Sequence, residues 1–284
     1  MLWARSSALF LIHKPVRIQL AALATLAGSP VPGTRKSIQK NDVRDVVLLH
    51  GWGFSAGVWD ELAGRLGPRL RVHVPDLPGY GAAPACAPYT LEGIAAAVAR
   101  SAPARCHVVG WSLGGEIALA WARRTPHQVQ RLALIGTTPC FTSKPGWPCA
   151  AAPALLREFG RSLAADRAGT LARFAAVQAK GDARARRFAS VMRQLSEGSA
   201  TDEVLAAGLD VLAGADLRRE LPRVRQPTLV LHGARDRIVP PVAGRRLAAA
   251  LPNARFSLLR ACAHAPFLSQ PVRVARELRR FFDE

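Results

Sequence analysis

An alternation of short apolar runs with segments of helical periodicity constrains the fold of this chain more than any other feature. Runs such as residues 46–50, VVLLH, are typical of strands buried on both faces of a sheet. Residues 90–100 instead place apolar side chains on one helical face, behind a threonine that can cap the helix. Strands that alternate with helices predict an α/β fold, a mostly parallel, doubly wound sheet with helices on both faces. The predicted strands are residues 46–50, 70–74, 106–109, 132–135, 228–232 and 256–259, and the predicted helices between and after them include residues 90–100, 113–124 and 272–282.

The alternation stops between residues 140 and 222, which contain helical patterns and little that reads as a strand. A helical insertion inside a doubly wound sheet predicts a cap, or lid, over the carboxyl ends of the strands, where such sheets bind ligands. We therefore expect a core formed by residues 42–139 and 223–284 and a helical cap formed by residues 140–222. The amphipathic segments in the cap are residues 155–163, 171–178 and 184–195.

Residues 1–41 form a basic extension with six Lys or Arg and no Asp or Glu. Their apolar stretch is interrupted, and no clear cleavage site follows it. Three interpretations remain open: a disordered extension, a translated upstream segment, or a removable targeting peptide.

One serine lies where a predicted strand meets a predicted helix. Residues 110–114 read GWSLG, and this strand–turn–helix setting is the one that a G-x-S-x-G nucleophile elbow requires. The two glycines permit a very tight turn, and the amides at the start of the following helix suit a developing negative charge. The sequence therefore predicts that Ser112 is a nucleophile. A serine that only caps a helix in a glycine-rich turn is the alternative for the motif taken alone.

A serine nucleophile needs a base, and the base needs a carboxylate that orients it. His264 lies between the last predicted strand and the last predicted helix, and Asp236 follows the next-to-last strand. The order Ser112, Asp236, His264 is the chain order of the triad in α/β-hydrolases. We therefore predict a triad of these three residues. Structural roles are expected for the other strand-end aspartate and the other histidines of the core: Asp76 as a turn former, His50 as a hydrogen-bonding residue that fixes a loop, and His73, His107 and His127 within the fold.

Attack on a carbonyl carbon creates an oxyanion that two backbone amides should stabilise. One amide is expected from Leu113, directly after the nucleophile. The other is expected from Trp52, in the loop HGWGF that follows the first predicted strand. Trp52 and Trp111 flank the serine, and we expect both to form walls of the substrate pocket, with a purely core role as the alternative.

The net charge of +19 favours an acidic partner. Nucleic acid is not expected, because the sequence lacks zinc-finger spacing, a basic zipper and an aromatic RNA-binding signature. A membrane is not expected either, since no apolar run reaches the ~18 residues that span a bilayer. The five cysteines are odd in number and lack metal-ligand spacing, which predicts free thiols in a cytoplasmic protein without a metal site. A bridge between Cys140 and Cys149 is the alternative.

The stretch from about residue 46 to the end resembles the α/β-hydrolases and, more narrowly, their family of pimeloyl-[acyl-carrier protein] methyl ester esterases, which act in biotin synthesis. The triad motifs are shared by many hydrolases, whereas the segment TPCF…WP and the cap residues are more specific. The residues that carry the narrower resemblance are LLHGWG with Val58-Trp59, DLPGYG, GWSLGG, Pro139-Cys140-Phe141 with Trp147-Pro148, Arg173-Phe174 with Gln178, Asp216-Leu217-Arg218, and Ala263-His264-Ala265-Pro266-Phe267.

The resemblance implies a serine esterase that hydrolyses the methyl ester of pimeloyl carried on acyl carrier protein and needs no cofactor. It further implies that Arg173 and Arg186 contact the carrier and that Phe174 lines the acyl channel. The charge of the predicted cap agrees, because residues 157–193 contain nine Lys or Arg against three Asp or Glu, and acyl carrier proteins are acidic. We expect the enzyme to act as a monomer.

Two rival functions remain open at this point. One is a different serine hydrolase of the same fold, namely a general short-chain carboxylesterase, a thioesterase or a C–C bond hydrolase. The other is a non-catalytic basic interaction protein that merely retains the scaffold. A complete set of triad and oxyanion residues argues against the second rival.

Overall fold

The structure is a computed structural model, and it describes residues 43–284. These residues belong to one compact unit. The basic extension of residues 1–41 lies outside the described residues. Within residues 43–284 no helix is long and apolar enough to cross a membrane.

Six strands form one sheet in the order β2-β1-β3-β4-β5-β6, and every neighbouring pair is parallel. The predicted parallel sheet is therefore confirmed. The order reverses between β1 and β3, since the chain first adds β2 on one side of β1 and then adds all later strands on the other. Ligands bind at such a switch point, beyond the carboxyl ends of the strands. The strands are β1 (Arg44–Leu49), β2 (Leu70–His73), β3 (Cys106–Trp111), β4 (Val129–Ile135), β5 (Thr228–Gly233) and β6 (Ala254–Leu259).

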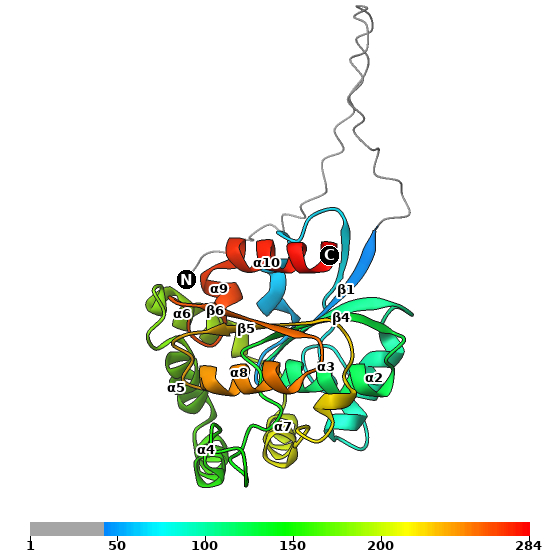
Figure 1. The fold of residues 1–284 in the computed structure, drawn as a ribbon. Helices are drawn as coiled ribbons and strands as arrows, with labels where there is room; N and C mark the ends of the chain where they lie inside the picture. The colour runs from blue at the N-terminus through cyan, green and yellow to red at the C-terminus, as the bar shows by residue number, and fades with distance from the viewer. Residues whose placement is uncertain (1–42) are drawn as a thin grey trace, which may run out of the picture. The chain divides into compact units, whose positions relative to one another are not determined.

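Helices cover both faces of the sheet, as the alternation predicts (Figure 1). Along β1, Val47 and Leu49 join the core on one face, while Val46 and Leu48 join the core on the other. This alternation follows from side chains that point to opposite faces of a strand. One face carries α2 (Leu91–Ser101), α3 (Leu113–Arg124) and α8 (Pro241–Ala250), with the short 3₁₀ turn η3 (Leu221–Arg223) against α8. The other face carries α1 (Asp60–Ala63), α9 (Pro266–Ser269) and α10 (Pro271–Asp283), with the short 3₁₀ turn η2 (Ala56–Trp59).

Local signals set several helix boundaries. Thr90 caps α2 by accepting a hydrogen bond from the Gly93 amide, as its position before the apolar periodicity predicts. The predicted helix of residues 113–124 is observed with the same bounds as α3. Pro271 occupies the first turn of α10, where its missing N–H would have no partner in the helix.

The chain between β4 and β5 contains four helices instead of the three segments predicted (Figure 1). The helix α7 was not singled out from the sequence. Its buried residues, among them Leu205, Leu209 and Val211, share one face, but beyond the first turn the exposed face is largely Ala and Gly, so the apolar stripe contrasts little with the rest of the helix. The four helices are α4 (Pro153–Ala165), α5 (Arg167–Ala179), α6 (Ala185–Ser196) and α7 (Asp202–Gly214).

All five cysteines, which lie within the described part of the chain, are free. The prediction of free thiols is confirmed, and the alternative of a Cys140–Cys149 bridge is wrong.

Candidate active site

Ser112 occupies a sharp turn between β3 and α3. Its φ of 53° and ψ of −120° make it the one residue other than glycine with a positive φ between residues 43 and 284. Such a backbone costs about 1–3 kcal/mol and persists only where the surrounding structure holds it. Both glycines of the motif are required: a Cβ at Gly110 would lie 2.4 Å from the Gly114 carbonyl oxygen, and a Cβ at Gly114 would lie 2.3 Å from the Leu49 carbonyl oxygen. The elbow predicted from the sequence therefore forms.

The loop after β1 lies directly beside this turn, because β1 and β3 are neighbours with Leu49 opposite Gly110. A Cβ at Gly51 would lie only 3.3 Å from the Cβ of Ser112. The predicted oxyanion donors, the backbone amides of Trp52 and Leu113, therefore belong to the two segments that meet at the serine. Their role stays a prediction.

His264 and Asp236 lie side by side in the interior, although 28 positions separate them in the chain. The Nδ1 of His264 and the Oδ2 of Asp236 are 2.8 Å apart. The other carboxylate oxygen, Oδ1, accepts hydrogen bonds of 2.9 Å from the amides of Ile238 and Val239. Burial alone would raise the pKa of Asp236. The charge of His264 and hydrogen bonds from histidine rings nevertheless hold that pKa well below its usual range, so the carboxylate stays ionised.

Two residues of the inserted helices hold the loop that carries His264. Asp182, in the turn between α5 and α6, accepts a 3.0 Å hydrogen bond from the Ala263 amide through Oδ2 and a 2.8 Å bond from the Arg184 amide through Oδ1. The carbonyl oxygen of Gln178 accepts a hydrogen bond from the His264 amide. The position of the histidine therefore depends on the insertion as well as on the sheet.

Ser112 and His264 open onto one cavity of about 350 Å³, the size of a small-molecule site. Its walls are mostly apolar, and α4, α5 and α7 provide most of them. Within residues 43–284, no group of three or more His, Cys, Asp or Glu side chains is placed to hold a metal ion. The large apolar side chains that line the cavity are Trp52, Trp111, Phe141, Leu155, Leu156, Phe159, Phe174, Val177, Leu209, Leu212 and Ile238.

The structure brings most of the predicted substrate-binding residues to this cavity. Trp52, Trp111, Phe174 and Arg173 all line it. Trp52 and Phe174 meet edge to face, with ring centroids 5.6 Å apart. Arg186 differs, since it lies exposed on α6 and outside the lining of the cavity. Any contact it makes with a substrate would be with a portion outside the cavity.

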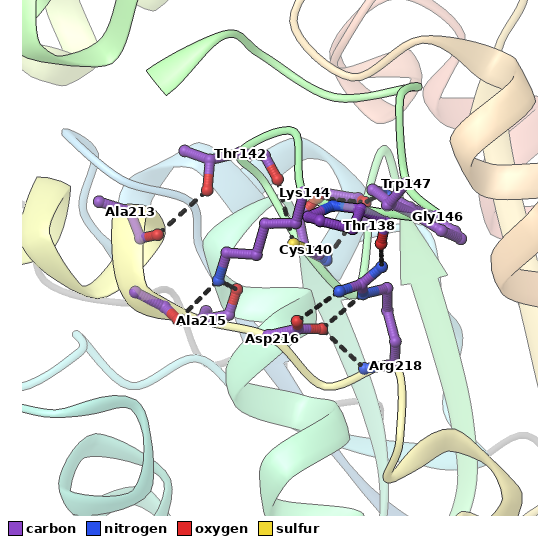
Figure 2. Close-up of polar contacts among 12 residues, drawn as sticks. Thr138, Cys140, Thr142, Lys144, Gly146, Trp147, Ala213, Ala215, Asp216 and Arg218 are labelled. Carbon is purple, nitrogen blue, oxygen red and sulfur yellow. Dashed lines mark hydrogen bonds and ion pairs between the residues drawn. The ribbon is translucent and has the colours of Figure 1, made fainter. Parts of the chain in front are cut away.

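A polar network ties two walls of the cavity together (Figure 2). The Lys144 ammonium donates to the carbonyl oxygens of Gly214 and Ala215 at the C-terminal end of α7, at 3.1 and 3.4 Å. Carbonyl groups at a helix end lack partners in the helix and favour a cation. Arg218 binds both carboxylate oxygens of Asp216 at 2.7 Å and donates to the Pro145 carbonyl oxygen at 2.6 Å. The network thus joins the segment that carries Phe141 to the helix that carries Leu209 and Leu212.

Sequence reasoning missed the cavity residues of α4 and α7. Leu156 and Phe159, three positions apart on α4, and Leu209 and Leu212, three positions apart on α7, each place two apolar side chains on one helical face. This spacing indicates an apolar helical face, but an apolar face can form either a cavity wall or part of a packed core. Their role follows from the space that the folded insertion leaves above Ser112.

The structural roles predicted for His50 and Asp76 are confirmed. The His50 ring is buried, its Nδ1 lies 2.9 Å from the Gly51 carbonyl oxygen, and its Nε2 accepts a 2.9 Å hydrogen bond from the Leu77 amide. Burial lowers the pKa of His50 to about 4, so the ring is neutral at physiological pH. Asp76 accepts a 2.7 Å hydrogen bond from the Ala56 amide through Oδ1. Both residues fix the loops beside the elbow.

Comparisons with known proteins agree with this arrangement. The model of the Alpha/beta hydrolase family matches residues 46–277. The chain is 46% identical over 237 residues to a pimeloyl-[acyl-carrier protein] methyl ester esterase from Aromatoleum aromaticum, a match covering 80% of this chain and 93% of the relative. It is 42% identical to the enzyme of that name from Nitrosomonas europaea, over 80% of this chain and 91% of the relative.

Among solved structures, an esterase from Exiguobacterium antarcticum superimposes with a TM-score of 0.78, covering 85% of this chain and 92% of the other at 24% identity. At that identity the likeness concerns the fold. The sequence relatives show family membership as well as the fold, because they match at much higher identity over nearly their whole length. This chain therefore belongs to the α/β-hydrolase family and, within it, to the same family as these two curated esterases.

Proposed function

We propose that this chain is a serine carboxylesterase that hydrolyses the methyl ester of a pimeloyl group carried on acyl carrier protein, a step of biotin synthesis. The observation that carries the proposal is the convergence of an elbow serine and a buried His264–Asp236 pair on one apolar cavity. The names and high identity of the sequence relatives supply the substrate.

In the proposed reaction Ser112 Oγ attacks the ester carbonyl carbon, and His264 takes the hydroxyl proton at Nε2. Its Nδ1–H donates to Asp236, whose charge stabilises the imidazolium that forms. The amides of Trp52 and Leu113 would stabilise the oxyanion. His264 then returns the proton to the leaving methoxide, and methanol departs. Water, activated by the same histidine, releases the pimeloyl group from Ser112 as a free carboxylate.

The cavity suits the acyl part of this substrate. A methyl ester at the end of a hydrocarbon chain is uncharged, so apolar walls contribute binding through the area they remove from water. We treat residues 140–222 as the cap of the site, because α4, α5 and α7 line the cavity above Ser112. The part of the substrate that joins the acyl group to its carrier protein must extend out of the cavity.

The carrier would dock on the basic surface of the cap. Arg173 and Arg186 are exposed there, and acyl carrier proteins are acidic. Arg173 lies at the cavity, where it donates to Thr170 at 2.8 Å and pairs with Asp166 at 3.5 Å. We further propose a cytoplasmic location, which the five free cysteines support.

The test is hydrolysis of purified pimeloyl-[acyl-carrier protein] methyl ester, followed by mass spectrometry of the carrier, with Ser112→Ala as the inactive control. We expect conversion to the free acid by the wild type alone. Growth rescue of a biotin auxotroph that lacks the esterase, lost with Ser112→Ala, should accompany it. Conversion that is equal in wild type and Ser112→Ala would contradict the proposal.

A general short-chain esterase is the remaining rival, and charge reversal separates it from a carrier-dependent enzyme. We expect Arg173→Glu and Arg186→Glu each to lower kcat/KM for the carrier-borne ester by about 5- to 50-fold, since like charges across an interface are repulsive. Hydrolysis of p-nitrophenyl butyrate by Arg186→Glu should stay within about twofold of wild type. Arg276→Glu on α10, also exposed, is the matched control. Equal losses on both substrates would favour the general esterase.

A further inference from the structure

A second imidazole lies against the carboxylate of the proposed triad. His232 is the fifth residue of β5, and its side chain is fully buried. Its Nε2 lies 3.2 Å from Asp236 Oδ2, the same oxygen that lies 2.8 Å from His264 Nδ1. Asp236 is thus enclosed by two rings on Oδ2 and by two backbone amides on Oδ1.

The backbone determines which nitrogen of His232 carries a proton. Nε2 lies 2.8 Å from the Val239 carbonyl oxygen, and a carbonyl oxygen can only accept a hydrogen bond. Nε2 is therefore protonated, and its N–H points to the turn that Asp236 begins. Val239 in turn donates its amide to Asp236 Oδ1 at 2.9 Å. His232 thus contacts the carboxylate directly and is also linked to it by the hydrogen bonds of Val239.

The opposite side of the ring is closely fitted. The Nδ1 of His232 is buried and has no hydrogen-bond partner among the described residues. It faces α8, where a Cβ at Gly244 would lie 2.3 Å from it. Only glycine, which has no Cβ, fits at position 244 while the ring of His232 is in this place. The ring is therefore confined to one orientation, with Nε2 directed at Val239 and Asp236.

We propose that His232 is a positioning residue of the triad, which holds Asp236 Oδ2 in line with His264 Nδ1 and places a partial positive charge beside that oxygen. The proposal rests on the proposed function, because it assigns a role through Asp236 and not through contact with substrate. Asp236 accepts two backbone amides on Oδ1, and two imidazole rings contact its Oδ2, so the carboxylate is already oriented for His264 before that ring becomes charged.

The arrangement also limits how strongly Asp236 attracts a proton. An N–H beside a carboxylate stabilises the charged form, so its loss makes the carboxylate more basic and strengthens its hold on a protonated His264. The titratable groups that act on Asp236 are the rings of His264 and His232, and Asp182 holds the histidine loop through the Ala263 amide. His232 and Asp236 are in direct contact at 3.2 Å.

A matched pair of substitutions tests the proposal. Gln and Met have similar length and volume, but only Gln carries an N–H₂ group that can reach both Val239 and Asp236. We expect His232→Met to lower kcat for p-nitrophenyl butyrate by roughly 10- to 100-fold, the equivalent of a hydrogen bond to a charged group, with KM changed less than about twofold. His232→Gln should retain kcat within about fivefold of wild type.

The pH profile provides a readout that loss of packing would not move. In His232→Met the acid limb of kcat/KM against pH should shift upward by about half a unit or more, while His232→Gln keeps the wild-type limb. His107→Met is the control for loss of a buried histidine, because His107 lies in β3 away from the cavity and stacks on Phe282. It should lower the melting temperature and leave the profile unchanged.

Two outcomes would overturn the proposal. One is a His232→Met enzyme with wild-type kcat and pH profile. The other is equal loss of kcat in the Gln and Met variants with no shift of the acid limb, which would indicate a purely structural ring. The proposed function is tested separately by Ser112→Ala and Asp236→Ala: if these variants keep full activity, the triad itself is wrong, whatever the His232 variants do.

Discussion

The indole N–H of Trp111 donates a 3.0 Å hydrogen bond to the backbone carbonyl oxygen of His264, 153 positions later in the chain. The residue directly before the proposed nucleophile therefore holds the loop that carries the proposed base. Their rings also approach to 5.5 Å between centroids. Trp111 is the last residue of β3, and its side chain both lines the cavity and fixes the position of the loop that carries His264.

Substitution of Trp111 by Phe should lower activity more than stability alone explains. Phe keeps an aromatic wall but leaves the His264 carbonyl oxygen without its donor, which costs about 1–3 kcal/mol of unfolding free energy. We expect kcat for p-nitrophenyl butyrate to fall by about tenfold. Trp121→Phe is the control, since Trp121 donates to Gln128 at 2.9 Å within the core, away from the cavity. It should lose similar stability with unchanged kcat, and equal kinetic losses in both variants would contradict this role.

Asp182 should act on catalysis although it lies in the turn between two inserted helices. Both its oxygens accept backbone amides, from Ala263 and Arg184, and Asn offers only one oxygen for the two. We expect Asp182→Asn to lower kcat by about 3- to 30-fold through displacement of the histidine loop. The check is kinetics beside thermal unfolding, with Thr90→Ala at the start of α2 as the comparison. That variant loses a helix cap, at about 1 kcal/mol, and should keep its kcat.

The close approach of α7 to Trp52 predicts a strong effect of one added methyl group. A Cβ at Gly208 would lie 2.7 Å from Trp52 Cδ1 and 2.9 Å from its Nε1, which donates to the Leu205 carbonyl oxygen. Gly208→Ala should therefore destabilise the protein by about 1–3 kcal/mol and raise KM, because either the indole or the helix must move.

Gly214→Ala, in the last turn of the same helix, is the matched control for that substitution. A Cβ there meets no atom within 4 Å, so the helix should gain about 0.4–1 kcal/mol with unchanged KM. Urea unfolding and steady-state kinetics of both variants decide the point. A stabilised Gly208→Ala protein would show that α7 does not rest on Trp52.

The buried Glu116 should make the free energy of unfolding depend on pH above about 4.5. It lies in the first turn of α3, it is 1% exposed, and neither carboxylate oxygen has a hydrogen-bond partner among residues 43–284. Burial raises the pKa of Glu116 well above its usual 4.5, and the charge of Lys144 opposes this only in part. The folded state therefore retains the proton while the unfolded chain releases it.

The sign follows from proton linkage. Because the folded pKa exceeds the unfolded one, the contribution of Glu116 is fully present below about pH 4.5 and is lost as pH rises towards the folded pKa. Glu116→Gln does not titrate, so its free energy of unfolding should increase relative to that of wild type as pH rises above about 4.5. The exposed Glu197→Gln is the control and should show a constant difference. Parallel curves for Glu116→Gln and wild type would contradict the buried neutral acid.

The sheet was largely predictable because its signals are local. Each strand is a short apolar run that needs no information from elsewhere, and α3 was predicted with its observed bounds. The helix α7 was missed because, beyond its first turn, its exposed face is largely Ala and Gly, so its apolar stripe contrasts little with the rest of the helix. The elbow was predictable for another reason: Gly110 and Gly114 are required by backbone approaches that occur within the turn and against the adjacent strand.

The residues that hold the site in place were less predictable. The triad candidates could be selected because each follows a strand, and the carboxyl ends of parallel strands meet at one edge. Nothing in the neighbourhood of Asp182 or His232 indicates that their side chains reach the histidine loop and the carboxylate. The contact of Asp182 with the Ala263 amide joins residues 81 positions apart, so it depends on where the inserted helices lie. His232 lies only four positions before Asp236, but the orientation of its ring depends on the close approach of Gly244 on α8.

By itself the sequence determined the fold class, the order of the strands along the chain and the candidates for nucleophile, base and acid, because periodicity, turn chemistry and strand ends are properties of short segments. The tertiary structure alone decided the cavity and the placement of Arg173 at it and of Arg186 away from it. These features arise from close packing across long sequence separations, where the free energy of each contact depends on the shape of a surface that no single segment contains.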